Sequence, residues 1–132
     1  PKSDRIEIRG IIDRYLEHAR ILIFCNGGDE QYYIGSADWM PRNLDKRVEI
    51  MFPVEDPALK EQVVHILKVQ LEDNVKAHIL QPDGTYEKID KRGKVLVTAQ
   101  KQFCEEAIAM AKAAVQQDDV HNTRVFVPAE SN

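Results

Sequence analysis

Hydrophobic and polar positions follow two different periods along the first third of this 132-residue chain. Residues 5–9 alternate charged and apolar side chains, which is typical of a half-buried strand, and residues 11–18 change to helical spacing. Two apolar runs, at 20–24 and 31–34, flank the turn sequence Asn-Gly-Gly-Asp at 26–29. The pattern therefore predicts a strand, a short helix and then a β-hairpin.

Further along, the pattern predicts two more strands and two long helices. Residues 47–52 alternate as a strand with one buried face, and residues 75–80 form another short strand. Asp56 followed by Pro57 is a strong helix start, with apolar positions on one face to about residue 72. Thr98 can cap a second long helix, and residues 86–94 between the two helices are expected to form a charged connection.

Strands interleaved with helices, without an internal repeat, indicate a single α/β layer structure. A chain of this length with 43% hydrophobic residues can bury one core but not two. We expect the domain to cover residues 1–117 and a polar tail to cover residues 118–132. The chain starts at Pro1 and has no apolar run near the roughly 20 residues that cross a bilayer. It is expected to be a soluble piece of something longer.

Charge and cysteine content narrow the function classes. The net charge of −4 makes attraction of the whole surface to nucleic acid or anionic lipid unfavourable, so any polyanion must be bound by a local basic pocket. Cys25 and Cys104 follow neither a metal-binding nor a redox spacing. We expect both to be buried free thiols in a reducing cytoplasm.

The most informative chemistry lies around His18 and along residues 33–50. His18 and Arg20 would share a face in an extended segment, so imidazole and guanidinium could converge on one anion. Histidine can act as nucleophile or general acid and base toward phosphorus, and arginine stabilises charge on phosphate oxygens. The alternative is an exposed histidine at the end of a helix.

Small and cationic residues gather after the hairpin. Ser36 and nearby backbone N–H groups could approach phosphate oxygens, and Asp38 could orient a histidine. Arg42 and Arg47 supply positive charge of the kind that stabilises phosphoryl transfer. An ordinary turn and a solvated surface, neutralised by neighbouring carboxylates, remain the alternatives. His65, His78 and His121 have no partner at metal-ligand spacing, so no metal ligands are predicted.

Three segments together carry a family resemblance: Tyr15-Leu16-Glu17-His18-Ala19-Arg20-Ile21, Asn26-Gly27-Gly28 and the run from Tyr33 to Glu49. They closely resemble the C-terminal region of bacterial polyphosphate kinase, densely in the first half of the chain and more loosely in the second. The resemblance implies a phospholipase D-like fold, a mixed sheet flanked by helices, of which this chain would be a single-domain fragment truncated on its N-terminal side. That fold's His-x-Lys and Gly-Ser-x-Asn motifs appear here with Arg20 in place of lysine and Asp38 in place of asparagine.

The resemblance further implies reversible transfer of the terminal phosphoryl group of ATP to polyphosphate, through a phosphohistidine in a preceding domain. His18 matches a second histidine, expected at the ATP site as a phosphate contact or proton donor, and Arg47 matches an arginine near the same phosphates. Arg20, Ser36, Asp38 and Arg42 would complete this chain's part of the ATP and phosphate site. Mg²⁺ would be bound largely by residues outside the fragment, which should not turn over alone.

The implied partners are ATP or ADP, polyphosphate and the preceding catalytic domain of the same polypeptide, within a homo-oligomeric enzyme that does not bind nucleic acid. A cytoplasmic location is expected, with membrane association of the full-length enzyme left open. Two alternatives remain at this stage. One is half of a phospholipase D-type phosphodiesterase, and the other is a non-catalytic module that only binds polyphosphate.

Overall fold

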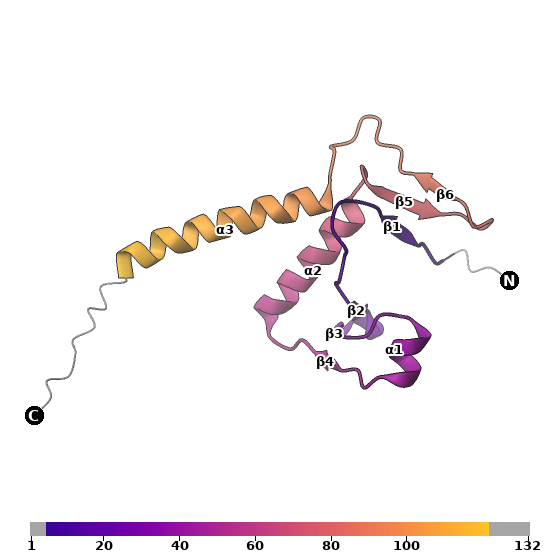
Figure 1. Cartoon of the computed structure of the whole chain (residues 1–132), viewed down its shortest axis with the longest axis horizontal. Helices are drawn as coiled ribbons and strands as arrows, with labels where there is room; N and C mark the ends of the chain where they lie inside the picture. Colours follow the sequence, from indigo (N-terminus) through magenta and orange to yellow (C-terminus); the bar gives the residue numbers. More distant parts are fainter. Residues whose placement is uncertain (1–4, 122–132) are drawn as a thin grey trace, which may run out of the picture. The chain divides into compact units, whose positions relative to one another are not determined.

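A computed structural model describes residues 5–121, with side chains through Val115, and divides into two compact units that part after Ala99. The first unit contains the strands and two of the helices, and the second consists of the remainder of the last helix (Figure 1). The elements are β1 (Arg9–Ile11), β2 (Ile21–Phe24), the 3₁₀ turn η1 (Asn26–Gly28), β3 (Gln31–Gly35), α1 (Pro41–Lys46), β4 (Met51–Pro53), α2 (Pro57–Glu72), β5 (Ala77–Leu80), β6 (Tyr86–Lys88) and α3 (Ala99–His121).

The predicted α/β class is confirmed, and the described strands form two small antiparallel sheets. One sheet has the order β1-β5-β6 and the other the order β2-β3-β4. Strands β2, β3 and β4 pair with their neighbours in sequence, whereas β1 pairs with the distant β5. The sheet β2-β3-β4 carries the residues of functional interest.

The predicted hairpin is confirmed, because β2 and β3 pair antiparallel from Ile21 opposite Ile34 to Phe24 opposite Gln31. Its connection needs left-handed backbone conformations, with φ of 69° at Gly27 and 105° at Gly28. Glycine adopts these without a steric penalty, which explains the Asn-Gly-Gly-Asp sequence.

Helix α2 also begins and ends where the sequence predicts. The Asp56 carboxylate accepts a hydrogen bond from the Leu59 N–H at 3.0 Å, and Pro57 occupies the first turn. Val63 and Val69 are its buried positions. The helix ends before Asp73, whose side chain is fully buried and accepts hydrogen bonds from four backbone N–H groups.

Several sequence predictions about elements are wrong. The helix expected at 11–18 does not form, because eight residues without an N-cap need tertiary packing, and Ile12, Tyr15 and Leu16 are exposed. The strand expected at 47–52 begins only at Met51, since α1 precedes it.

The charged connection expected at 86–94 begins with a strand, β6, which pairs with β5. The second long helix continues to His121, into the segment 118–132 expected to be a polar tail, and residues 122–132 lie outside the described residues. Cys25 and Cys104 are exposed free thiols, so their expected burial is wrong: the chain does not cover the outer end of β2 or that position of α3.

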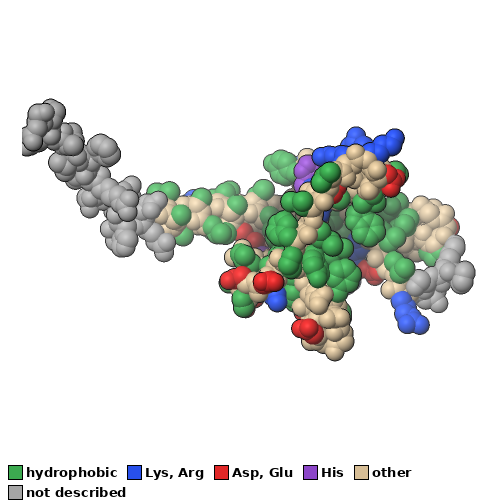
Figure 2. Space-filling model, turned by 90° about the horizontal axis from the view of Figure 1, so that it is seen from below, with side chains coloured by type: hydrophobic (Ala, Val, Ile, Leu, Met, Phe, Trp, Pro, Cys, Tyr) green, Lys and Arg blue, Asp and Glu red, His purple; other side chains and the backbone are tan. Residues whose placement is uncertain are grey.

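Buried apolar side chains are few in the described chain, whereas many large ones reach the surface. Figure 2 shows hydrophobic side chains gathered on the body formed by residues 5–99. The buried apolar residues are Val54, Val63, Val69, Ala77 and Ala99. None of the described helices is both long enough and apolar enough to span a membrane.

Candidate functional site

The topology of the sheet β2-β3-β4 gathers the predicted site residues at one of its ends. Because neighbouring strands are antiparallel, the start of β2, the end of β3 and the start of β4 lie at the same end of the sheet. His18 and Arg20 precede β2, Ser36 and Asp38 follow β3, and Arg47 precedes β4. Three segments that are separate in sequence therefore contribute to one small region.

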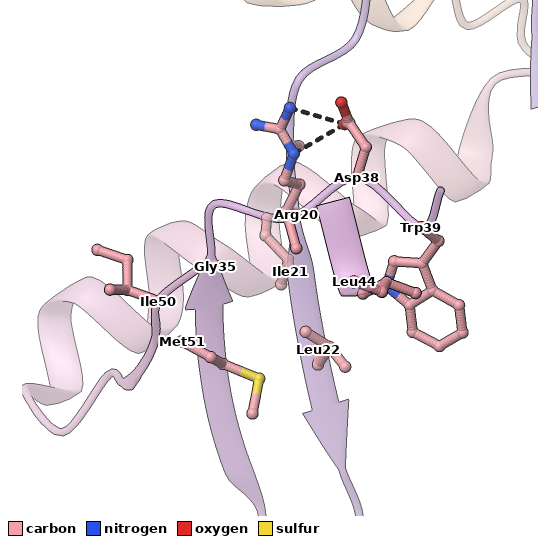
Figure 3. A pocket seen from close by; sticks show the side chains of 11 residues that line it. Arg20, Ile21, Leu22, Gly35, Asp38, Trp39, Leu44, Ile50 and Met51 are labelled. Carbon is pink, nitrogen blue, oxygen red and sulfur yellow. Dashed lines mark hydrogen bonds and ion pairs between the residues drawn. The ribbon is translucent and has the colours of Figure 1, made fainter. Parts of the chain in front are cut away.

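Arg20 and Asp38 form the best-defined pair of this region. The Arg20 Nε and Nη2 groups donate to the same oxygen of Asp38, Oδ1, at 2.9 and 2.7 Å (Figure 3). These hydrogen bonds hold the pKa of the Asp38 carboxyl below its ordinary value, and the charge of His18 contributes to the same lowering. Asp38 is therefore ionised at neutral pH, and two of the three Arg20 guanidinium nitrogens are used to bind it.

His18 lies beside this pair in an exposed, irregular segment. The third guanidinium nitrogen of Arg20, Nη1, donates to the His18 backbone carbonyl at 3.3 Å, which ties the segment to the pair. No group among the described residues forms a hydrogen bond with the imidazole of His18. The ring is thus placed near the Arg20–Asp38 pair and remains accessible to a ligand.

Ser36 joins the end of β3 to the segment before β4. Its hydroxyl donates to the Glu49 carboxylate and accepts from the Ile50 N–H at 3.0 Å, while its backbone N–H donates to the Ile50 carbonyl at 3.0 Å. A hydroxyl has one proton to donate, and here that proton goes to Glu49. The structure thus uses Ser36 to hold Glu49.

Arg47 lies on the other side of Glu49, with its Nε 3.4 Å from Glu49 Oε1. Its Nη1 donates to the Asn43 side chain at 3.4 Å. Asn43 is 2% exposed, and its own amide donates to the Asp38 backbone carbonyl at 3.5 Å. Asn43 thereby connects the Arg20–Asp38 pair to Arg47.

Asn43 is not among the site residues that the sequence predicts, and the sequence indicates Glu49 only as a carboxylate that neutralises its neighbours. The spacing offered a signal, since Asn43 lies four residues before Arg47, within reach along a helical turn. Arg42, the remaining predicted site residue, is exposed on α1, and none of the described residues forms a hydrogen bond or ion pair with it. The structure brings together the other five predicted residues and leaves Arg42 at their margin.

A pocket of about 650 Å³ opens beside the Arg20–Asp38 pair. Figure 3 shows the pair at one end, with Leu22 and Met51 further along the strands and Trp39 to one side. Trp39 is 83% exposed. Apart from Arg20 and Asp38, the lining is formed by small and apolar residues: Ala19, Ile21, Leu22, Gly35, Ala37, Trp39, Leu44, Ile50 and Met51.

The oxygen-bearing side chains at this end do not fit a magnesium site. Asp38 is paired with Arg20, and Glu49 is bound by Ser36 and faces Arg47. Among the residues whose side chains the structure describes, no group of three or more histidine, cysteine, aspartate or glutamate side chains could hold a metal ion. Mg²⁺ is usually bound through one or two carboxylates together with waters and phosphate oxygens, and the two carboxylates at this end are already engaged by Arg20 and by Ser36 and Arg47.

Comparison with known proteins gives a consistent result. The family model described as "Polyphosphate kinase C-terminal domain 2" matches residues 2–100. A protein named polyphosphate kinase from Thermosynechococcus vestitus is 57% identical over 84 residues, which cover 64% of this chain and 12% of that protein. A protein of the same name from Lactiplantibacillus plantarum is 45% identical over 111 residues, covering 84% of this chain and 16% of that protein.

A solved structure is also similar. The crystal structure of polyphosphate kinase from Porphyromonas gingivalis superposes with a TM-score of 0.74 at 36% sequence identity, covering 83% of this chain and 17% of that chain. The chain spans less than a fifth of the length of each of these three proteins.

Proposed function

The chain belongs to the polyphosphate kinase C-terminal domain 2 family, and on that premise we propose that it forms part of the ATP and phosphate site of an ATP:polyphosphate phosphotransferase. The reaction is the reversible transfer of the terminal phosphoryl group of ATP to polyphosphate. One observation carries the assignment to this region: His18, the Arg20–Asp38 pair and Arg47 meet at one end of the sheet β2-β3-β4.

His18 and Arg47 are the groups of this chain that act on the phosphates. The His18 imidazole has an exposed position and can contact a phosphate oxygen or protonate a leaving one. Arg47 offsets the charge that develops on the phosphoryl oxygens, because its side chain is 63% exposed and presents guanidinium donors to solvent. Arg20 serves mainly to hold Asp38, and Arg42 adds positive charge at the margin.

The rest of the site comes from outside this chain. The phosphohistidine that carries the phosphoryl group would belong to a preceding domain of a longer polypeptide, and Mg²⁺ would be held there as well. The exposed apolar side chains of the first unit support such a neighbour, since Trp39, Leu44 and Met51 stay in contact with water when the chain is alone. We expect the isolated chain to bind phosphates without turnover, and the complete enzyme to be a cytoplasmic homo-oligomer.

The test is a titration of the isotope-labelled chain with ATP-magnesium and with polyphosphate, followed by amide and imidazole chemical shifts. We expect saturable shifts at His18, Ser36 and Arg47, weakened in the variants His18→Ala and Arg47→Ala. Arg92→Ala is the matched control, because Arg92 pairs with Asp90 on an exposed loop and its replacement should leave the titration unchanged.

Two other outcomes would contradict the proposal. Equal binding by wild type, His18→Ala and Arg47→Ala would place the phosphates elsewhere and favour a module that binds polyphosphate without these groups. Hydrolysis of a chromogenic phosphodiester by the chain would favour the phospholipase D-type alternative. The Arg20–Asp38 pair argues against that alternative. In a phosphodiesterase of this type the cation at this position would have to bind the substrate phosphate, whereas here Arg20 binds Asp38.

A further inference from the structure

The two carboxylate oxygens of Glu49 lie in different surroundings. It is 14% exposed, its Oε2 accepts the hydroxyl proton of Ser36, and its Oε1 is buried with no hydrogen-bond donor among the described residues. The Arg47 Nε, 3.4 Å from Oε1, is the cation that offsets this charge. A carboxylate that loses water needs such compensation, which ties Glu49 to Arg47.

We propose that Glu49 is a positioning residue that fixes the Arg47 guanidinium for phosphate binding, and that Ser36 in turn fixes Glu49. The inference rests on the proposed function, in which Arg47 contacts the phosphates. Glu49 itself touches no phosphate in this account.

The geometry around Arg47 supports this arrangement. Glu49 faces the guanidinium at Nε, and the buried Asn43 accepts from Nη1 at 3.4 Å. No described residue accepts a hydrogen bond from Nη2, which leaves part of the planar fork available to phosphate oxygens. A guanidinium held from two sides loses less side-chain entropy on binding than a freely rotating one.

Ser36 gives Glu49 a fixed position through the backbone. The hydroxyl that donates to Glu49 also accepts from the Ile50 N–H, and Ser36 and Ile50 exchange a further backbone hydrogen bond. Both groups are thus anchored where β3 ends and β4 approaches. The small Ser36 side chain contributes by holding Glu49 rather than by reaching the ligand.

If Glu49 acted only through its charge, Glu49→Gln would change the anion affinity in the opposite direction. If Glu49 only lowered the positive charge near Arg47, then Glu49→Gln would remove repulsion and tighten the binding of an anion. If Glu49 positions Arg47, the same variant should weaken binding despite the loss of a negative charge. The direction of the change therefore separates the two accounts.

The experiment uses the whole chain, with tripolyphosphate as the probe and two readouts. The first is the ¹⁵N order parameter of the Arg47 Nε–Hε group without ligand, and the second is tripolyphosphate affinity by calorimetry. We expect Glu49→Gln to lower the order parameter and to weaken binding by at least about fivefold, as the loss of one charge-assisted contact implies. Ser36→Ala should do the same to a smaller extent, and Ser36→Thr, which keeps a hydroxyl, should restore wild-type behaviour.

The controls separate failure of the inference from failure of the proposed function. Arg47→Ala tests the proposed function, and if tripolyphosphate binds the wild type and this variant equally, or binds neither, Arg47 has no phosphate role. If Arg47→Ala weakens binding while Glu49→Gln leaves it unchanged or tightens it, the positioning role is overturned and the phosphate role stands. An unchanged Arg47 order parameter in Glu49→Gln also overturns it, and an unchanged amide spectrum away from Glu49 shows that the variant is folded.

Discussion

Replacing Asp73 by asparagine tests how the fold of the first unit is held together. The Asp73 side chain is fully buried, and its Oδ1 accepts from the backbone N–H groups of Val75, Lys76 and Ala77 at 3.0, 2.7 and 3.2 Å. Its Oδ2 accepts from the Ala99 N–H at 2.8 Å. One carboxylate therefore connects the end of α2 with the start of β5 and the first residue of α3.

The expected loss of stability follows from these four contacts. Asparagine has the same shape, so its oxygen can keep the three contacts at Oδ1, while its NH₂ group would face the Ala99 N–H, donor against donor. Losing one hydrogen bond to a charged group costs about 1.5–3 kcal/mol, and the remaining three bonds weaken because the acceptor is neutral. We expect Asp73→Asn to lower the free energy of unfolding by about 2–4 kcal/mol. Asp73→Ala, which strands all four N–H groups, should cost more than about 4 kcal/mol.

The assay is urea unfolding of the chain at neutral pH, followed by circular dichroism and by Trp39 fluorescence. Asp83→Asn is the matched control, because Asp83 also accepts from a backbone N–H, that of Thr85, but on an exposed turn. Its replacement should have a much smaller effect. A loss below about 1 kcal/mol for Asp73→Asn, or a loss equal to that of the control, would show that Asp73 does not hold α2, β5 and α3 together, because buried charge-assisted hydrogen bonds cannot be removed at so small a cost.

Three further predictions concern single contacts. The Arg20 guanidinium lowers the pKa of the Asp38 carboxyl below its ordinary value, so the pair stabilises the fold above the ordinary pKa and the contribution disappears as pH falls through the lowered one. Arg20→Gln should return the carboxyl ¹³C titration toward the ordinary value, and an unmoved titration would contradict the pairing. Asp56→Ala should remove the cap of α2 and lower the free energy of unfolding by about 1 kcal/mol in urea, with Asp56→Asn close to wild type; equal stability of all three proteins would argue against the cap. Gly35→Ala places a Cβ 3.3 Å from the Ile50 carbonyl oxygen, so the melting temperature should fall. An unchanged melting temperature would show that the backbone at Ile50 moves aside without cost.

The elements that the sequence predicts correctly are those with local signals. The two glycines of the hairpin turn, at positive φ, and the Asp56 cap are decided by neighbours within a few residues. The segment ending at His18 was predicted as a helix from its spacing alone, and that prediction is wrong because an isolated eight-residue helix needs a packing partner. Strand β6 was missed because its three residues gain their order only by pairing with β5.

The site shows the same division. Residue types at His18, Arg20, Ser36, Asp38 and Arg47 were found because a family pattern fixes them at several spacings at once. Of the two polar residues that hold them, Asn43 has a local signal in its four-residue spacing to Arg47. Glu49 gains its role only where the end of β3 meets the segment before β4, and no local pattern reports that.

The most direct test of the central claim is turnover of a complete polyphosphate kinase polypeptide carrying this domain, comparing wild type with His18→Ala. His65→Ala, on the exposed surface of α2, is the matched control. We expect His18→Ala to lower kcat for polyphosphate synthesis by at least about 100-fold, because it loses a group that protonates or contacts the transferring phosphate. The control should keep wild-type kcat. Wild-type turnover by His18→Ala would contradict the role of His18 in phosphoryl transfer.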